Sequence, residues 1–169
     1  MTVLTTERLK LEELVPEDAA FALALLNDPD FIANVADRGL RTIREAEKYL
    51  IDGPIASYRK HGFGMYAIRR LDNGDTIGMC GLVKRPGLED IDIGYGFLPA
   101  ARGHGFAREA ARAVFNFARE ELGLTRIVAI VSPGNVPSIA LLESLGMHHE
   151  SMVRLPGDEQ SIRLYAWSS

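Results

Sequence analysis

The order of hydrophobic and polar residues along the chain predicts a series of short strands. Apolar or alternating segments bounded by turn residues occur at 8–12, 65–70, 76–84, 91–98, 126–131, 148–154 and 161–167. The turn Asp72-Asn73-Gly74-Asp75 predicts an antiparallel hairpin between the second and third of these segments. With 91–98 as the last strand of a meander, we expect a central, mostly antiparallel sheet of about seven strands.

Two helical segments precede this meander. An apolar segment at 16–27 predicts the first helix. Thr42 is expected to cap the second, with Glu45 as its capping-box partner. Gly53-Pro54 interrupts the second helix, which resumes to Lys60. The interrupted region is either the wall or lid of a site or a plain helix–turn–helix.

Two more helices follow the meander. The first places Ala107, Ala111, Val114, Ala118 and Leu122 on one face and Arg108, Arg112, Asn116 and Arg119 on the other. It leads by a crossover to the strand 126–131, which should therefore lie parallel to 91–98. Asn135 is expected to cap the last helix, and since Pro137 has no N–H, the cap bond must go to Ser138. Strands that are apolar on both faces predict helices on both sides of the sheet, hence a mixed α+β fold.

Composition limits the classes of function. The chain has 169 residues, of which 47% are hydrophobic and 25% charged, which predicts one globular domain over 1–169. A formal net charge of −4 argues against nucleic acid or a membrane surface as a partner, because both require a broad basic surface. The lone cysteine, Cys80, should be a buried, unreactive thiol, which fits the cytoplasm. No secretion signal or membrane-spanning segment is expected.

A glycine loop lies between the strand 91–98 and the helix that follows it. It reads Arg102-Gly103-His104-Gly105-Phe106-Ala107-Arg108. The first N–H groups of a helix have no partner one turn earlier, and the helix dipole is positive there, so the loop suits a phosphate. The basic side chains around it strengthen this interpretation over that of a plain turn.

Two other phosphate-binding motifs fit poorly. The P-loop needs Gly-Lys-Ser or Gly-Lys-Thr, which this loop lacks. The dinucleotide fingerprint matches Gly103 and Gly105, but Arg108 stands where a small residue is needed, and the strand 126–131 does not end in an acid for a ribose. A nucleotide-binding oxidoreductase is therefore a distant alternative.

What matches better is Arg102-x-x-Gly105-x-Ala107, which resembles the Arg/Gln-x-x-Gly-x-Gly/Ala motif of the GNAT superfamily of N-acetyltransferases. Asn135-x-x-Ser138, followed by Leu145-Gly146-Met147, is similar to a second segment of that family. Thr6-Glu7-Arg8-Leu9-Lys10-Leu11 is similar to the start of its ribosomal-protein-alanine N-acetyltransferase branch. The resemblance implies a GNAT-like fold over nearly the whole chain, with a splayed pair of parallel strands that takes acetyl-CoA.

The resemblance also implies the cofactor contacts. Acetyl-CoA would be the co-substrate, and no metal would be required. Its pantetheine would lie beside 91–98 as a pseudo-strand, where the N–H of Phe97 or Leu98, but not Pro99, would hold the acetyl oxygen. The expected cofactor-binding residues are Phe97, Leu98, Arg102, Gly103, His104, Gly105, Phe106, Ala107, Arg108, Asn135 and Ser138.

Ser138 is the candidate general acid. Many GNAT enzymes carry a tyrosine in this role seven residues after the asparagine, where this chain has Leu142. Ser138 is the expected replacement because it lies on the first helical turn facing the cofactor. The alternatives are a solvent-exposed serine or one that only supports the cap. Water could then protonate the leaving thiol, whose pKa is about 8.5.

Asp92 is the candidate general base, in a position where the branch usually has Glu. Strand alternation places it on the same face as Gly94 and Gly96, which should leave room for a ligand. Its alternative role is an ion pair with a helix arginine. The four histidines, His61, His104, His148 and His149, lack partners spaced for metal binding.

The predicted function is transfer of an acetyl group from acetyl-CoA to a primary amine. The amine could be a protein N-terminus, a polyamine, an aminoglycoside-like drug or an amino acid, and the residues 31–58 that would select it are not diagnostic. A non-catalytic acyl-CoA-binding sensor is the main alternative, because the tyrosine is missing. A homodimer is one assembly that the sequence leaves open.

Overall fold

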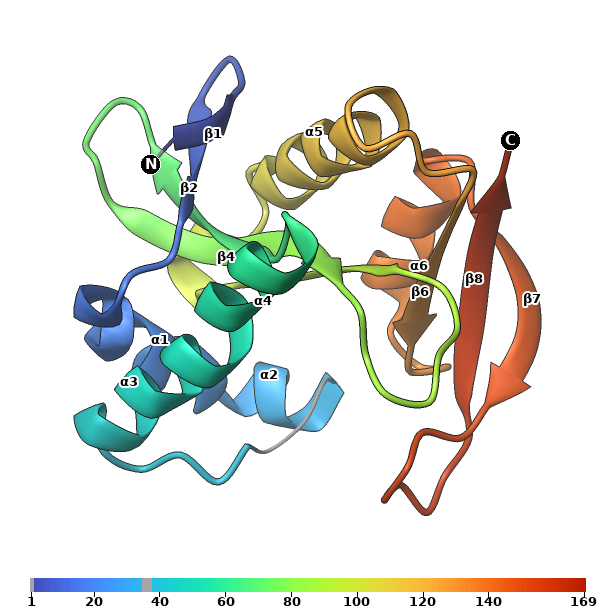
Figure 1. Cartoon of the computed structure of the whole chain (residues 1–169), viewed down its shortest axis with the longest axis horizontal. Coiled ribbons are helices and arrows are strands. Elements are labelled where there is room, and N and C mark those ends of the chain that lie inside the picture. Colours follow the sequence, from blue (N-terminus) through green and yellow to red (C-terminus); the bar gives the residue numbers. More distant parts are fainter. Residues whose placement is uncertain (1, 35–37) are drawn as a thin grey trace.

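A single eight-stranded sheet forms the centre of the computed structural model, which describes residues 2–34 and 38–169 (Figure 1). The strand order is β1-β2-β3-β4-β5-β6-β8-β7. The strands are β1 (Thr2–Thr5), β2 (Leu9–Glu13), β3 (Met65–Arg70), β4 (Thr76–Val83), β5 (Asp92–Phe97), β6 (Arg126–Val131), β7 (His148–Val153) and β8 (Ile162–Ser168). All the predicted strands are present. The additional edge strand, β1, has 4 residues, too few for its periodicity to be recognised.

The two strands at the middle of the sheet, β5 and β6, run parallel, as the helical crossover predicts. Their neighbours in the described sheet all pair antiparallel. β5 and β6 pair where Asp92 lies opposite Val128, and there the Val128 N–H donates to the Ile91 carbonyl at 3.1 Å. Beyond this point, toward Phe97, the two strands separate. The predicted splayed pair is therefore confirmed.

Helices cover both faces of the sheet. On one face α1 (Ala19–Leu26) and α3 (Ile43–Leu50) pack on Ala67 and Met79. On the other, α5 (Phe106–Glu120) and α6 (Val136–Ser144) pack in the cluster that contains Ile68 and Cys80. Because chain neighbours on one strand point to opposite faces, the two clusters lie on opposite sides of the sheet. The predicted mixed α+β fold is confirmed.

The helical region before β3 differs from its prediction. Gly53-Pro54 does not interrupt the helix, because Ile51–Ile55 form a π-helical turn that joins α3 to α4 (Ala56–His61). Proline lacks an N–H and clashes with the carbonyl four residues earlier in an α-helix, and the wider π turn accommodates it. A further short helix, α2 (Pro29–Asn34), was not predicted.

Several local predictions are confirmed. Thr42 caps α3 and accepts the Glu45 N–H. Asn135 caps α6, and its Oδ1 accepts the Ser138 N–H at 3.4 Å.

Cys80 is fully buried, and burial raises the pKa of its thiol, which keeps it unreactive. Within 2–34 and 38–169, no helix is both long enough and apolar enough to cross a membrane.

Candidate active site

The glycine loop has the backbone geometry of an anion site. Gly103 and Gly105 have left-handed φ angles of +80° and +79°, and Gly105 is the N-cap of α5. A glycine cap offers no side-chain oxygen, so the first-turn N–H groups of Phe106, Ala107 and Arg108 are not capped by it. Left-handed residues within a turn bring N–H groups to one side, where they form a concavity for an anion.

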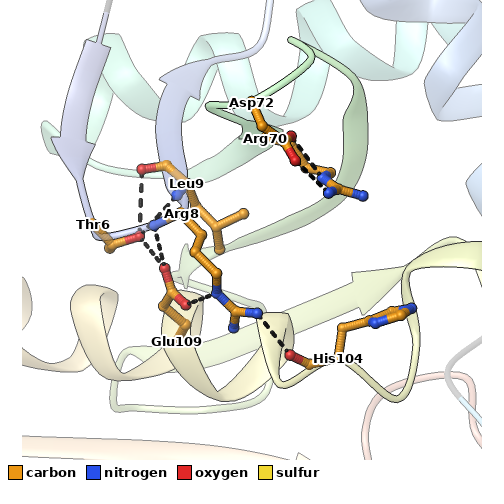
Figure 2. Close-up of polar contacts among 7 residues, drawn as sticks. All are labelled: Thr6, Arg8, Leu9, Arg70, Asp72, His104 and Glu109. Carbon is orange, nitrogen blue, oxygen red and sulfur yellow. Dashed lines mark hydrogen bonds and ion pairs between the residues drawn. The ribbon is translucent and has the colours of Figure 1, made fainter.

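A network on the other side of the loop holds it in place (Figure 2). The carboxylate of Glu109, in the first turn of α5, accepts hydrogen bonds from Thr6 Oγ at 2.6 Å, the Arg8 N–H at 2.9 Å and Arg8 Nε at 2.7 Å. Arg8 Nη1 donates to the His104 carbonyl at 2.9 Å, and its guanidinium lies 4.4 Å from the Phe106 ring centroid. The chain before β2 therefore braces the loop.

This brace was missed in the sequence, where the segment from Thr6 served only as a sign of family resemblance. Burial raises the pKa of Glu109, but the hydrogen bonds from Thr6 and Arg8 outweigh it, and the net pKa is lowered. A Cβ at Gly105 would lie 3.5 Å from Arg8 Nη2. That is an ordinary van der Waals distance, so the positive φ, which residues with a side chain rarely adopt, accounts for the glycine.

Arg102 makes its contacts toward α2. Its Nη1 pairs with Asp30 at 2.6 Å, and its Nη2 pairs with Asp28 at 2.6 Å and donates to the Phe97 carbonyl at 2.9 Å. Burial raises the pKa of Asp28, but the hydrogen bonds from Arg102 and from the Phe31 N–H outweigh this effect. The net pKa of Asp28 is therefore lowered. The guanidinium thus ties the end of β5 to α2, and its predicted contact with phosphate stays a prediction.

A cavity of about 780 Å³ opens between the separated ends of β5 and β6. Ala107, Asn135 and Ser138 line it on the side of α5 and α6. Asn135, predicted to bind the cofactor, has its Oδ1 engaged in the α6 cap, and its side chain still borders this cavity. The cavity therefore joins the first turn of α5 to the gap in the sheet.

The structure distinguishes the two predicted donors for the acetyl oxygen. The Leu98 N–H donates to the Ile77 carbonyl of β4 at 2.9 Å and is therefore occupied, so it is not available for the acetyl oxygen. Because N–H directions alternate along a strand and Phe97 pairs with Gly78, the Phe97 N–H points to the β6 side. Of these two N–H groups, that of Phe97 is directed toward the gap between β5 and β6, and its contact with the acetyl oxygen stays a prediction.

Asp92 lies at the buried start of β5, with 1% of its surface exposed. Arg85, in the connection between β4 and β5, donates to its carboxylate from Nη2 at 3.1 Å and Nε at 3.3 Å. Burial raises the pKa of Asp92, against the opposing effect of Arg85. The ion pair considered for Asp92 is present, but with a loop arginine instead of a helix arginine. Asp92 also lines the cavity, so its role as base stays a prediction.

The space expected beside Gly94 and Gly96 is only partly open. A Cβ at Gly96 would lie 3.1 Å from the ring of Phe31, on α2. At Gly94 the nearest atom is Met65 Sδ at 3.8 Å. Gly94, Gly96 and Phe31 all line the cavity, so Phe31 takes up part of the space beside Gly96, and a ligand in the rest of it stays a prediction.

Ser138 has a partner that the sequence did not reveal. The hydroxyl of Tyr95, on β5, lies 2.6 Å from Ser138 Oγ and 3.3 Å from the Ser138 carbonyl oxygen. Both side chains line the cavity, and so does Leu142, which is 1% exposed and offers no polar group. In the sequence Tyr95 is one of several apolar residues on alternate positions of a strand, and only the fold brings it to Ser138.

The remaining predicted contacts lie around the loop. His104 contributes its carbonyl to Arg8, and its ring lies 5.7 Å from that of Phe106. Arg108 is exposed on α5. Among the residues that the structure describes, no group of three or more His, Cys, Asp or Glu side chains is arranged to hold a metal ion.

Comparison with known proteins agrees with this geometry. The profile of the acetyltransferase (GNAT) domain matches residues 8–148, so the chain belongs to the GNAT acetyltransferase family and is an acetyltransferase. YkkB of Bacillus subtilis (strain 168), described as an uncharacterized protein, is 30% identical over 157 residues, which cover 90% of this chain and 89% of YkkB. YnaD of the same organism, described as an uncharacterized N-acetyltransferase, is 25% identical over 151 residues, 89% of this chain and 85% of YnaD.

A solved structure gives the same result for the fold. The crystal structure of an acetyltransferase from Agrobacterium tumefaciens str. C58 has a TM-score of 0.83 and 26% identity, and the match covers 100% of this chain and 95% of that one. The predicted family, fold and enzyme class are therefore confirmed.

Proposed function

We propose that this acetyltransferase takes acetyl-CoA as donor and a primary amine as acceptor, which react directly in a ternary complex. The observation that carries the proposal is that the first turn of α5, at Ala107, borders the same cavity as the gap between β5 and β6. A phosphate at the helix N-terminus and an extended arm in the gap would then belong to one ligand. Coenzyme A combines a pyrophosphate with such an arm.

The residues of the cavity supply the chemistry. The Phe97 N–H would polarise the thioester carbonyl, and the amine nitrogen would form its bond to the carbonyl carbon from the opposite side. The carbon–sulfur bond then breaks, its electron pair goes to sulfur, and the amine gives up its extra proton to solvent or to a base such as Asp92. Ser138, which lines the same cavity, would return a proton to sulfur.

The acceptor class is a protein N-terminus or a small-molecule amine. Asp30, Phe31 and Arg38 line the cavity on the side of α2, opposite the helix that would hold the cofactor, and so form part of the acceptor entrance. We also propose, from the sequence, that the protein is cytoplasmic, that residues 1–169 form a single domain and that it can form a homodimer.

Thermal unfolding with acetyl-CoA tests cofactor binding. At a ligand concentration of one hundred times Kd the folded state gains about 2.7 kcal/mol, which raises Tm by roughly 5–11 °C for a chain of this size. A Tm that does not change up to millimolar acetyl-CoA would contradict the proposal.

A screen of amines for release of the CoA thiol then tests catalysis. Turnover with a protein N-terminal peptide, a polyamine, an aminoglycoside or an amino acid identifies the acceptor class. Strong stabilisation by acetyl-CoA without thiol release for any amine would favour the sensor over the enzyme.

A further inference from the structure

Two hydroxyl groups from different elements meet inside the cavity. Tyr95 comes from β5 and Ser138 from the first turn of α6, and their oxygens are 2.6 Å apart. Tyr95 is two positions before Phe97 on the same strand, so the pair lies beside the N–H that we expect to hold the acetyl oxygen. The pair is therefore close to the expected position of the thioester.

Either hydroxyl can donate in the hydrogen bond between Tyr95 and Ser138, and a relay toward the cavity needs Tyr95 as the donor. The Tyr95 O–H can donate to Ser138 Oγ at 2.6 Å or to the Ser138 carbonyl at 3.3 Å. The shorter contact has the distance of a strong O–H···O bond, and the longer one lies outside that range. Donation to Oγ leaves the proton of Ser138 free to point to another acceptor in the cavity.

Ser138 alone is a poor proton source. Loss of its proton would leave an alkoxide, whereas a tyrosine is among the side chains that ionise in proteins, with an ordinary pKa of about 10. Burial raises the pKa of Tyr95 to about 12, so this phenol keeps its proton at neutral pH. A serine that donates to a thiolate therefore needs a second donor behind it.

We propose that Tyr95 and Ser138 form a two-hydroxyl relay to the leaving sulfur, in which Tyr95 donates to Ser138 Oγ and Ser138 donates to the thiolate. The inference rests on the proposed acetyl transfer and adds to it a residue on the strand. It also accounts for Leu142, because a phenol reaches the cavity from β5 instead of from α6.

The carbon–sulfur bond breaks and its electron pair stays on sulfur, which takes the Ser138 proton. Ser138 Oγ takes the Tyr95 proton in the same step, so no alkoxide forms. The Tyr95 phenolate recovers a proton from solvent, which receives the proton released by the amine.

The test measures the pKa of the CoA thiol in the complex, by ultraviolet absorbance of the thiolate, and needs no acceptor amine. The proteins are the wild type, Tyr95→Phe, Ser138→Ala and the double variant. Tyr95→Phe keeps the ring in the core and removes only the hydroxyl. Calorimetry with acetyl-CoA, run in parallel, reports cofactor binding separately.

In the wild type we expect a thiol pKa below the ordinary value of about 8.5, because a donor stabilises the thiolate. Tyr95→Phe should raise it by about 0.5–1, and Ser138→Ala by at least as much. In the Ser138→Ala background, Tyr95→Phe should have no further effect. Where an acceptor is known, kcat should fall about tenfold in both single variants, with the Kd for acetyl-CoA unchanged.

Tyr58→Phe is the matched control. Its hydroxyl is also half-buried and hydrogen-bonded, to the Leu14 N–H and the Met65 carbonyl, but Tyr58 does not line the cavity. This variant should lower Tm and leave the thiol pKa unchanged.

An unchanged thiol pKa in Tyr95→Phe, with acetyl-CoA still bound, would overturn the relay and leave the proposed function intact. The relay would also be overturned if Tyr95→Phe changed the thiol pKa equally in the wild type and in the Ser138→Ala background, because Tyr95 would then act on sulfur directly. Failure of the wild type to bind acetyl-CoA would overturn the proposed function and the relay together.

Discussion

Gly103 and Gly123 share a conformation but not a location. Both have left-handed φ angles, +80° and +67°, and a Cβ at either position would meet no atom within 4 Å. An alanine in this conformation costs about 1–2 kcal/mol. We therefore expect Gly103→Ala and Gly123→Ala to lower the free energy of unfolding by similar amounts.

The two variants should differ in cofactor binding. Gly103→Ala strains the loop that directs N–H groups to the phosphate, so its Kd for acetyl-CoA should rise about tenfold or more, as loss of one hydrogen bond to a charged group implies. Gly123→Ala, at the far end of α5, should bind acetyl-CoA like the wild type in a calorimetric titration. Equal affinities for both variants would place the phosphates elsewhere.

The residues predicted correctly are those fixed by local chemistry. Ser138 receives the Asn135 cap because Pro137 has no N–H to offer, which involves only neighbours in the chain. Tyr95 could not be predicted, since its role depends on a serine 43 residues away. The choice of Phe97 over Leu98 likewise required the register of β4 against β5.

Contacts between the segment before β2 and α5 explain how the glycine loop is held. In Figure 2 Arg8 reaches both Glu109 and the His104 carbonyl, whereas Arg70 forms its ion pair with Asp72. Both guanidinium groups lie near the Phe106 ring, at 4.4 and 5.3 Å from its centroid. Arg70 is therefore a matched control for Arg8.

We expect Arg8→Ala to raise the Kd for acetyl-CoA about tenfold, because the loop loses a hydrogen bond to its own carbonyl and the first turn of α5 loses its ion pair. Arg70→Ala removes a similar charge and should change the Kd by less than about twofold, as exposed pairs contribute little. Titration calorimetry at two salt concentrations measures both. A similar loss in both variants would indicate a general effect of positive charge instead of a brace.

The same brace predicts a pH dependence. The pKa of Glu109 is lowered below its ordinary 4.5 in the folded protein, so its contribution to stability is complete above about pH 4.5 and is lost as the pH falls through the lowered value. The Tm difference between the wild type and Glu109→Gln should therefore be full at pH 7 and shrink as the pH falls below about 4.5. A difference that grows on acidification would contradict this assignment.

The elements missed in the sequence are those with weak local signals. β1 has 4 residues and α2 has 6, both shorter than the patterns that identify strands and helices. At Gly53-Pro54 the local rule predicts a break, and the π turn that avoids it is a property of the packed helix pair α3 and α4. Longer elements such as α5 followed their periodicity closely.

The fold of the whole molecule was predictable because few topologies satisfy its constraints. A tight hairpin, a three-strand meander and a right-handed crossover together fix the position of β6 beside β5. What the sequence did not show is how far the two strands stay together. Their pairing at Asp92 and Val128 divides the sheet into β1 to β5 on one side and β6, β8 and β7 on the other.

That division has a consequence for hydrogen exchange. The Val128 N–H is bonded to the Ile91 carbonyl, and by alternation the Ile130 N–H also points toward β5, where the strands have separated and Ile130 lines the cavity. Without ligand, the Ile130 amide should exchange with deuterium much faster than that of Val128, although both lie in the same strand. An arm of acetyl-CoA that acts as a missing strand should slow the exchange at Ile130 and leave Val128 unchanged, so one amide reports whether the cofactor completes the sheet.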